Sequence, residues 1–275
     1  MLKRFFDRFR KPKENPKSTT SKRDLFQELF PLSEENKQHI ESRVYSIFEG
    51  MHGQEGLDAM KNYSREYQVI PKKFRSLNFD SLGWESFDIE EDGVAFRNEY
   101  GDIMLVMTSQ PNGKMVKGNS ELLVYRNWLR EQYVNQGGGL IFCEEIVNDQ
   151  GVEAYESIAK LPRENTTGMD YTYFLNISNY EEQMLYQLNV RVLEMSPTGT
   201  RDNILLVPLC DISGMEMMEF TNHYRQDPYQ AEYEEGNRMN LSEREEFDYL
   251  YPFHPLSILR NEIRPKLLKS LKFNS

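Results

Sequence analysis

The stretch of the chain that decides the fold runs from Asn119 to Asp202, and its middle part, residues 140–161, reads LIFCEEIVNDQGVEAYESIAKL. Two runs rich in β-favouring residues, 140–147 and 152–161, flank the turn-forming sequence NDQG. This pattern predicts a β-hairpin, because Asn, Asp and Gly adopt the backbone angles that a tight turn requires. The hairpin in turn predicts an antiparallel sheet.

A helix is predicted immediately before the hairpin. Asn119 and Ser120 are favourable N-terminal caps, and glycines 137–139 end the helix because glycine enters the left-handed C-cap conformation without a steric clash. Between them, apolar and aromatic residues recur three or four positions apart: Leu122, Tyr125, Leu129 and Tyr133. Such a stripe lies along one side of a helix and needs another element to cover.

Two further strands are predicted after the hairpin, at residues 171–177 and 184–193. In the second, alternate residues form a consistently apolar face: Tyr186, Leu188, Val190 and Val192. The remaining positions of this strand mix polar and apolar residues. Because side chains alternate between the two sides of a strand, this pattern predicts a sheet with one face on the hydrophobic core.

The upstream segments predict a helix followed by a meander of strands. Ser33 caps a helix whose apolar stripe packs either on the main domain or on a partner: Ile40, Val44, Ile47, Phe48 and Met51. Three strands are then predicted at residues 84–89, 94–97 and 103–107. The carboxylates among residues 80–92 lack the spacing of a calcium loop, so no metal site is expected there.

Downstream, residues 204–209 are a candidate buried strand or helix. The sequence Ser242-Glu243-Arg244-Glu245 fits a capping box and predicts a helix that continues to about Leu250. A last helix, in which Pro265 is expected to introduce a kink, carries another apolar stripe: Leu256, Leu259, Ile263, Leu267 and Leu271. The stripes near the two ends of the chain are candidate surfaces for a partner.

Together these elements predict an α+β fold in which helices pack on a largely antiparallel sheet. The chain divides into a basic flexible tail at residues 1–23, a helical extension at 24–80 and a main domain at 81–275. The main domain includes an acidic C-terminal segment and the terminal helix.

The tail begins with a short amphipathic pattern. Four apolar residues would share one side of a helix over residues 1–11, with Arg and Lys around the other: Leu2, Phe5, Phe6 and Phe9. This composition is typical of segments that contact an anionic membrane surface weakly, and the alternative is a frayed basic tail.

The net charge of −11 is unevenly distributed. The tail carries nine Lys or Arg and two acidic residues, whereas residues 202–251 carry twelve acidic and three basic residues. Because a body this acidic repels a phosphate backbone, nucleic acid is not an expected partner.

The cysteines and the hydropathy pattern indicate the compartment. Cys143 and Cys210 are the only cysteines, too few for a disulfide scaffold. No run approaches the roughly 20 apolar residues that span a bilayer, and no apolar signal-peptide core follows the basic start. A cytoplasmic protein is expected.

Four short segments resemble a group of uncharacterised bacterial proteins: Gly137-Gly138-Gly139, Gly199-Thr200-Arg201-Asp202, Asp227-Pro228-Tyr229 and His254-Pro255-Leu256-Ser257. The order of strands and helix also resembles the PsbP-like α/β fold, which includes the DcrB-like proteins and the Eag-type chaperones of type VI secretion. This resemblance covers about Trp84 to Arg264. It implies a fold more than an activity, since none of the motifs is a catalytic signature.

The distinctive segments supply six candidate residues for binding a ligand or partner: Arg201, Asp202, Asp227, Tyr229, His254 and Ser257. For Arg201, the alternative is an ion pair with a neighbouring carboxylate beside a tight turn. For His254 and Ser257, the alternative to a catalytic pair is a helix-entry His and a capping-turn Ser, because no Gly-x-Ser-x-Gly elbow is present. No catalytic residue, metal ligand or cofactor is assigned.

The leading hypothesis is a non-enzymatic protein-binding module, similar to a chaperone or adaptor, that uses a sheet face or groove for an apolar segment of another protein. One alternative is an immunity or inhibitor protein whose acidic surface blocks a basic toxin. A second alternative is a hydrolase-like enzyme that uses Arg201, Asp202 and His254.

Overall fold

The computed structural model describes residues 32–274 with five gaps, at residues 112–114, 116–121, 164–167, 195–198 and 231–232. The predicted caps Asn119 and Ser120 and the whole tail of residues 1–23, with its four apolar residues Leu2, Phe5, Phe6 and Phe9, lie outside the described residues.

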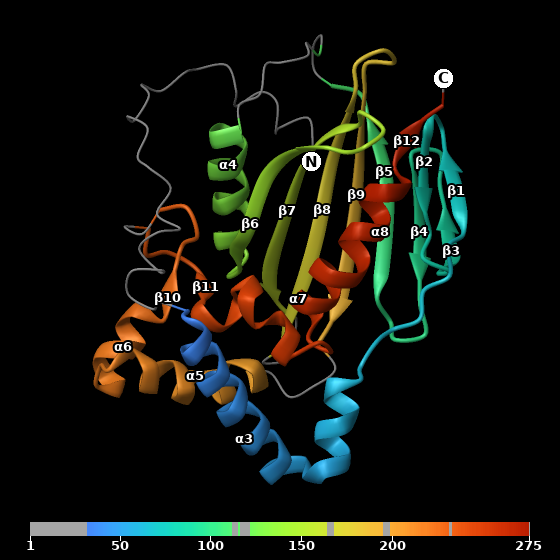
Figure 1. Cartoon of the computed structure of the whole chain (residues 1–275). Coiled ribbons are helices and arrows are strands. Elements are labelled where there is room, and N and C mark those ends of the chain that lie inside the picture. Colours follow the sequence, from blue (N-terminus) through green and yellow to red (C-terminus); the bar gives the residue numbers. More distant parts are fainter. Residues whose placement is uncertain are drawn as a thin grey trace.

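The structure is an α+β fold built on a seven-stranded sheet with the order β3-β4-β5-β9-β8-β7-β6, in which every neighbouring pair is antiparallel (Figure 1). The strands are β1 Pro71–Phe74, β2 Leu77–Asp80, β3 Glu85–Ile89, β4 Gly93–Arg97, β5 Ile103–Ser109, β6 Gly139–Val147, β7 Glu153–Pro162, β8 Met169–Asn179, β9 Met184–Leu193, β10 Arg225–Gln226, β11 Met239–Asn240 and β12 Lys272–Phe273. The predicted hairpin is confirmed as β6 and β7, which pair from Val147 opposite Glu153 to Gly139 opposite Lys160.

The helical elements surround this sheet. They are α3 Glu34–Lys61, α4 Leu122–Val134, α5 Thr200–Ser213, α6 Met217–His223, the 3₁₀ turns η2 Leu241–Glu243 and η3 Glu245–Leu250, α7 Pro255–Ile258, the π-helical turn η4 Leu259–Ile263 and α8 Arg264–Ser270. Within the described parts of the chain, no helix is both long and apolar enough to cross a membrane.

One face of the sheet carries the main hydrophobic core. The predicted apolar face of β9 is confirmed, because Tyr186, Leu188, Val190 and Val192 are all buried. The C-terminal helices cover this face with their predicted apolar stripe: Leu256, Leu259, Ile263, Leu267 and Leu271. This stripe is therefore part of the core. The π-helical turn η4 lies directly before Pro265, whose missing amide hydrogen removes a helical hydrogen bond at the expected irregularity.

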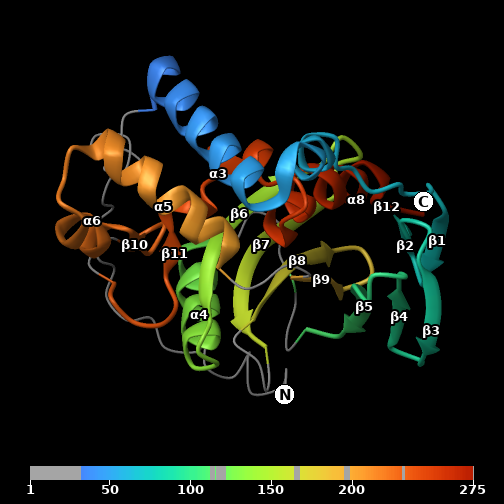
Figure 2. The same ribbon diagram turned by 90° about the horizontal axis from the view of Figure 1, so that it is seen from below.

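The opposite face of the sheet is covered at one end by α4, which packs on β6 and β7 through Leu129 and Tyr133 (Figure 2). The predicted glycine ending of this helix is confirmed. Gly137 has a φ of 75° and donates to the Val134 carbonyl, and Gly138 donates to the Tyr133 carbonyl. These are the two hydrogen bonds of a Schellman motif, which satisfy the last carbonyls of α4.

Residues 71–80, which the sequence places in a helical extension, form β1 and β2 instead. The pairing that stabilises them comes from the other end of the chain, because β12 adds to β2 as the third strand of a small sheet. A strand pairing over this sequence separation leaves no local periodicity from which it can be predicted.

A second core cluster joins α3, α5 and the turns after β11. The predicted stripe of α3 packs here through Ile40, Val44 and Phe48, whereas its last residue, Met51, is 57% exposed. For most of the stripe the structure therefore favours packing within the chain over a partner. Residues 204–209, a candidate strand or helix, belong to the helix α5.

The helix predicted from Ser242 to Leu250 is replaced by two 3₁₀ turns separated by Arg244, which has an extended backbone. The N-cap lies two residues earlier than predicted, at Asn240, and the Glu243 carboxylate accepts from the backbone amide of Asn240 at 2.7 Å. The continuous helix is lost because the carbonyls of Ser242 and Arg244 accept hydrogen bonds from a buried guanidinium, that of Arg201.

Candidate functional site

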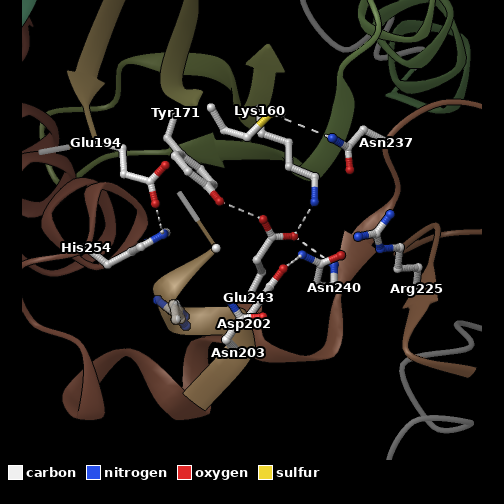
Figure 3. A pocket seen from close by; sticks show the side chains of 13 residues that line it. Lys160, Tyr171, Glu194, Asp202, Asn203, Arg225, Asn237, Asn240, Glu243 and His254 are labelled. Atoms are coloured by element: carbon white, nitrogen blue, oxygen red, sulfur yellow. Dashed lines mark hydrogen bonds and ion pairs between the residues drawn. The ribbon is translucent and has the colours of Figure 1, made fainter. Parts of the chain in front are cut away.

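Four of the six candidate residues lie together beside one cavity of about 370 Å³. Arg201, Asp202 and His254 line it, and Ser257 lies behind Arg201, to which its hydroxyl is hydrogen-bonded at 2.9 Å. Figure 3 shows the side chains converging from the sheet, from the start of α5 and from the segment after β11. The regions around Arg201 and His254 therefore form one site.

The sheet provides the floor of this cavity. Lys160 on β7 lies directly opposite Tyr171 on β8, and both side chains point to the buried face near the ends of their strands. Helix α5 then begins at the rim, after Gly199, whose φ of 80° is a left-handed conformation that glycine adopts without strain. Arg201 and Asp202 are consequently in the first turn of a helix rather than in the loop expected from the sequence.

Glu243 is the centre of a buried polar network in the cavity (Figure 3). Its carboxylate accepts from the Lys160 ammonium at 2.7 Å, from the Tyr171 hydroxyl at 2.8 Å and from the backbone amide of Asn240 at 2.7 Å. Burial, and secondarily the Glu243 charge, raises the pKa of Tyr171 well above its usual range. Tyr171 therefore donates to the carboxylate as a neutral phenol.

Asp202 forms a second carboxylate centre. It accepts from the Ser242 hydroxyl, from the Asn240 side-chain amide at 2.5 Å and from the Tyr224 hydroxyl at 3.4 Å. Burial raises the pKa of Asp202, and the nearby Glu243 charge raises it further. Both carboxylates are thus occupied by donors from the protein itself.

Arg201 is buried, and its guanidinium is hydrogen-bonded to other groups of the protein. Its guanidinium pairs with Asp248 at 2.9 Å, in addition to its bonds to Ser257 and to two backbone carbonyls. Asp248 also pairs with Arg260 at 3.2 Å, so a single carboxylate serves two arginines. The ion-pair interpretation of Arg201 is confirmed, and this side chain links α5 to the turns η2 and η3 and to α7.

His254 lies at the start of α7, as expected if it is a helix-entry residue and not part of a catalytic pair. Its Nδ1 accepts from the Leu256 amide at 3.2 Å, which caps α7 and places the ring proton on Nε2. Burial lowers the pKa of His254 well below its usual range, and the charges of Arg201, Arg260 and Lys160 lower it further. The Glu194 carboxylate lies 3.9 Å from Nε2, beyond hydrogen-bond distance.

A serine hydrolase arrangement is not formed at this site. The Ser257 hydroxyl accepts from Arg201 and donates to Asp248 at 3.3 Å, whereas the Nδ1 atom of His254 accepts from the Leu256 amide and Nε2 lies nearest to Glu194. Ser257 lies inside α7 and is not a capping-turn residue. In the part of the chain that the structure describes, no group of three or more metal-ligating side chains is placed to hold a metal ion.

The other two candidates, Asp227 and Tyr229, lie elsewhere, beside α4. Asp227 forms a buried bidentate pair with Arg130 at 2.7 and 2.8 Å. The Tyr229 hydroxyl bonds to the backbone of Cys143 on β6, while the Arg126 guanidinium stacks 3.7 Å from its ring. These contacts hold the segment after β10 against α4 and β6, so both residues have a structural role here.

The residues most deeply involved in the cavity were missed by sequence reasoning: Lys160, Tyr171, Asn240 and Glu243. One signal for them is present in the hairpin. Lys160 and Glu156 share the core face of β7 with Ala154 and Ile158, and charged residues at alternating core positions indicate buried ion pairs.

A second candidate surface is the part of the sheet that α4 leaves uncovered. Over β4, β5 and β9, on the side of α4, the sheet presents the exposed side chains of Arg97 and Arg191 at one end and otherwise half-buried apolar and amide side chains: Ile103, Leu105, Met107, Leu185, Gln187, Asn189 and Leu193. Figure 2 shows α4 below the β6–β7 end of the sheet, and none of the other described helices lies below β5 and β9. The edge strand β3 continues this surface with the exposed side chain of Phe87, whose ring lies 5.5 Å from the Arg97 guanidinium.

Comparison with known proteins adds no assignment. No protein-family model matches the chain, and no curated protein matches it.

Proposed function

We propose that the protein is a binding module for another protein and that the uncovered sheet surface over β4, β5 and β9 is where the partner docks. The observation that carries this proposal is the composition of that surface. Its central residues, among them Leu105, Met107 and Asn189, are apolar or neutral amides, and the exposed Arg97 and Arg191 lie at one end of it. Depletion of charge with retained apolar area is typical of the centre of a protein interface.

The two apolar helix stripes that were candidate partner surfaces are largely buried within the chain, which supports the choice of the sheet surface. The stripe of α3 packs on α5, and the stripe of the C-terminal helices packs on the sheet. Both are used within the chain. The sheet surface beside α4, by contrast, is not covered by a described helix.

The shape of this surface supports an amphipathic helix of the partner as the occupant. The strands β9, β5 and β4 are adjacent, and two spacings of about 4.8 Å give a width of roughly 10 Å. This matches the diameter of one helix. The chain already covers the other end of the same face with a helix, α4, and a partner helix would complete that layer.

The inhibitor alternative receives less support. Of the twelve acidic residues in the range 202–251, three are buried in ion pairs with arginine or lysine: Asp227, Glu243 and Asp248. Their charges are neutralised internally and do not contribute to steering a basic partner.

The proposal retains the expectation of a cytoplasmic protein with a PsbP-like fold, similar to the secretion chaperones of that fold. Two buried free thiols, Cys143 and Cys210, support a reducing compartment. Burial raises the pKa of Cys143 to about 12, which keeps this thiol protonated and unreactive.

The test is affinity purification of the full chain from its native cells, with substitutions that place a charge on the proposed surface. Asn189→Asp is nearly isosteric, and Leu105→Glu is more disruptive. Met218→Glu, at a residue on α6 that is 82% exposed, is the matched control. We expect a stoichiometric partner with the wild type and the control, and its loss with both surface variants when their thermal unfolding remains normal.

Two outcomes would overturn the proposal. Partner capture that is unchanged by Asn189→Asp and Leu105→Glu would exclude this surface. Capture that weakens steeply with salt, for the wild type as for Asn189→Asp, would favour the inhibitor alternative, because burial of neutral surface responds little to ionic strength. Size-exclusion chromatography with light scattering distinguishes a second copy of the chain from a different partner.

A further inference from the structure

The cavity at the amino end of α5 has a surplus of hydrogen-bond donors on one side. The carboxylates of Glu243 and Asp202 are occupied by donors from the protein, as described above. The Lys160 ammonium has three protons, and within the described residues its hydrogen bond to Glu243 accounts for one of them. The Arg225 side chain is exposed at the rim and has no hydrogen-bond or ion-pair partner among the described residues.

A buried acceptor in the same cavity also lacks a partner. Asn240 is only 6% exposed, and its Oδ1 has no hydrogen bond within the described structure. The amide orientation is determined by its neighbour, because the nitrogen of this side chain donates to the Asp202 carboxylate. A buried amide oxygen without a hydrogen bond costs free energy, so this atom is an available acceptor for a donor that enters the cavity.

These groups line one cavity and lie near one another in it. Figure 3 shows the Lys160 ammonium, the Asn240 side chain and the Arg225 guanidinium on the same side of the cavity, with Asn237 above them. The amino end of α5 adds positive potential at the opposite rim, since the helix has 14 residues and no side chain caps its first amides. A volume of about 370 Å³ suits a small molecule.

We propose that this cavity binds a small organic anion, a carboxylate or a phosphate ester, that carries a hydrogen-bond donor beside its anionic group. The anionic oxygens bind between Lys160 and Arg225, where two cations converge. The neighbouring hydroxyl or amine of the ligand donates to the Asn240 Oδ1. This inference does not depend on the docking of a partner protein at the sheet surface.

The experiment uses two pairs of probes with the full chain, measured by ligand-detected NMR and by thermal shift at millimolar concentration. Glycolate differs from acetate only by a hydroxyl, and 2-hydroxyethyl phosphate differs from ethyl phosphate in the same way. We expect binding of the hydroxyl-bearing member of at least one pair, and the pair that binds distinguishes carboxylate from phosphate recognition.

Arg225→Gln is the informative variant, because its exposed side chain has no hydrogen-bond or ion-pair partner among the described residues. It should weaken binding by about tenfold or more, the usual effect of losing one charge-assisted hydrogen bond. Arg238→Gln, in the same segment but outside the cavity, is the matched control and should bind as the wild type does. Failure of all four probes to bind the wild type, equal binding by Arg225→Gln, or equal binding of probes with and without the hydroxyl would each overturn the proposal.

Discussion

Replacing His254 with asparagine tests whether the imidazole beside the cavity stays neutral in the folded protein. The ring is 3% exposed and accepts the Leu256 amide through Nδ1, so it caps α7. Asparagine is itself a favourable N-cap and its side-chain oxygen can accept the same amide. The variant therefore keeps the cap and removes the only titrating group at this position.

The expected magnitude follows from the direction of the pKa shift. Burial and the cations Arg201, Arg260 and Lys160 lower the pKa of His254 in the folded state, whereas the unfolded chain has the ordinary value of about 6.5. Below that pH the unfolded state binds a proton that the folded state refuses. The contribution of the neutral imidazole to the free energy of unfolding is therefore complete above about pH 6.5. It falls by about 1.4 kcal/mol for each pH unit below that value, until the pH reaches the pKa of His254 in the folded protein.

The assay is urea unfolding of the wild type and His254→Asn at several pH values between about 8 and about 5.5. Other titrating groups cancel in the difference between the two proteins. At the higher pH the wild type should be more stable, because its ring packs edge-on against Tyr171 at 4.9 Å. By about pH 5.5 this advantage should shrink by about 1.4 kcal/mol.

A difference that stays constant over this pH range would refute the reasoning. It would mean that the imidazole protonates in the folded protein as readily as in the unfolded chain, with Glu194 as its counter-ion.

Two further predictions concern stability. Lys160→Met should cost about 3–5 kcal/mol in urea unfolding, because it leaves the Glu243 charge buried without its cation, and adding Glu243→Gln should recover part of that loss; equal losses in the single and double variants would contradict this. Gly139→Ala should strongly lower the melting temperature, because the new Cβ would lie 1.8 Å from the Asn237 carbonyl oxygen. The control is Gly50→Ala within α3, where no atom lies within 4 Å of the new Cβ, and this substitution should stabilise the protein by about 0.5–1 kcal/mol.

The contacts of the candidate site could be predicted from the sequence only in part. The residue types at Arg201 and His254 marked two segments as unusual, and both segments reach one cavity. Their partners could not be read from the chain, because Lys160 and Glu243 are 83 residues apart and Arg201 and Ser257 are 56 residues apart. No local pattern encodes which buried charges meet. For the same reason, Asp227 and Tyr229 could not be distinguished in advance from the residues of the cavity.

The sequence by itself determined the elements whose structure depends on adjacent residues. The β6–β7 hairpin, the glycine ending of α4 and the apolar face of β9 follow from turn chemistry and side-chain periodicity within a few positions. The tertiary structure alone decided three features: the strands at residues 71–80, the 3₁₀ turns around Arg244 and the cavity. Each depends on a contact with a distant segment, whose free energy exceeds the local preference of the residues involved.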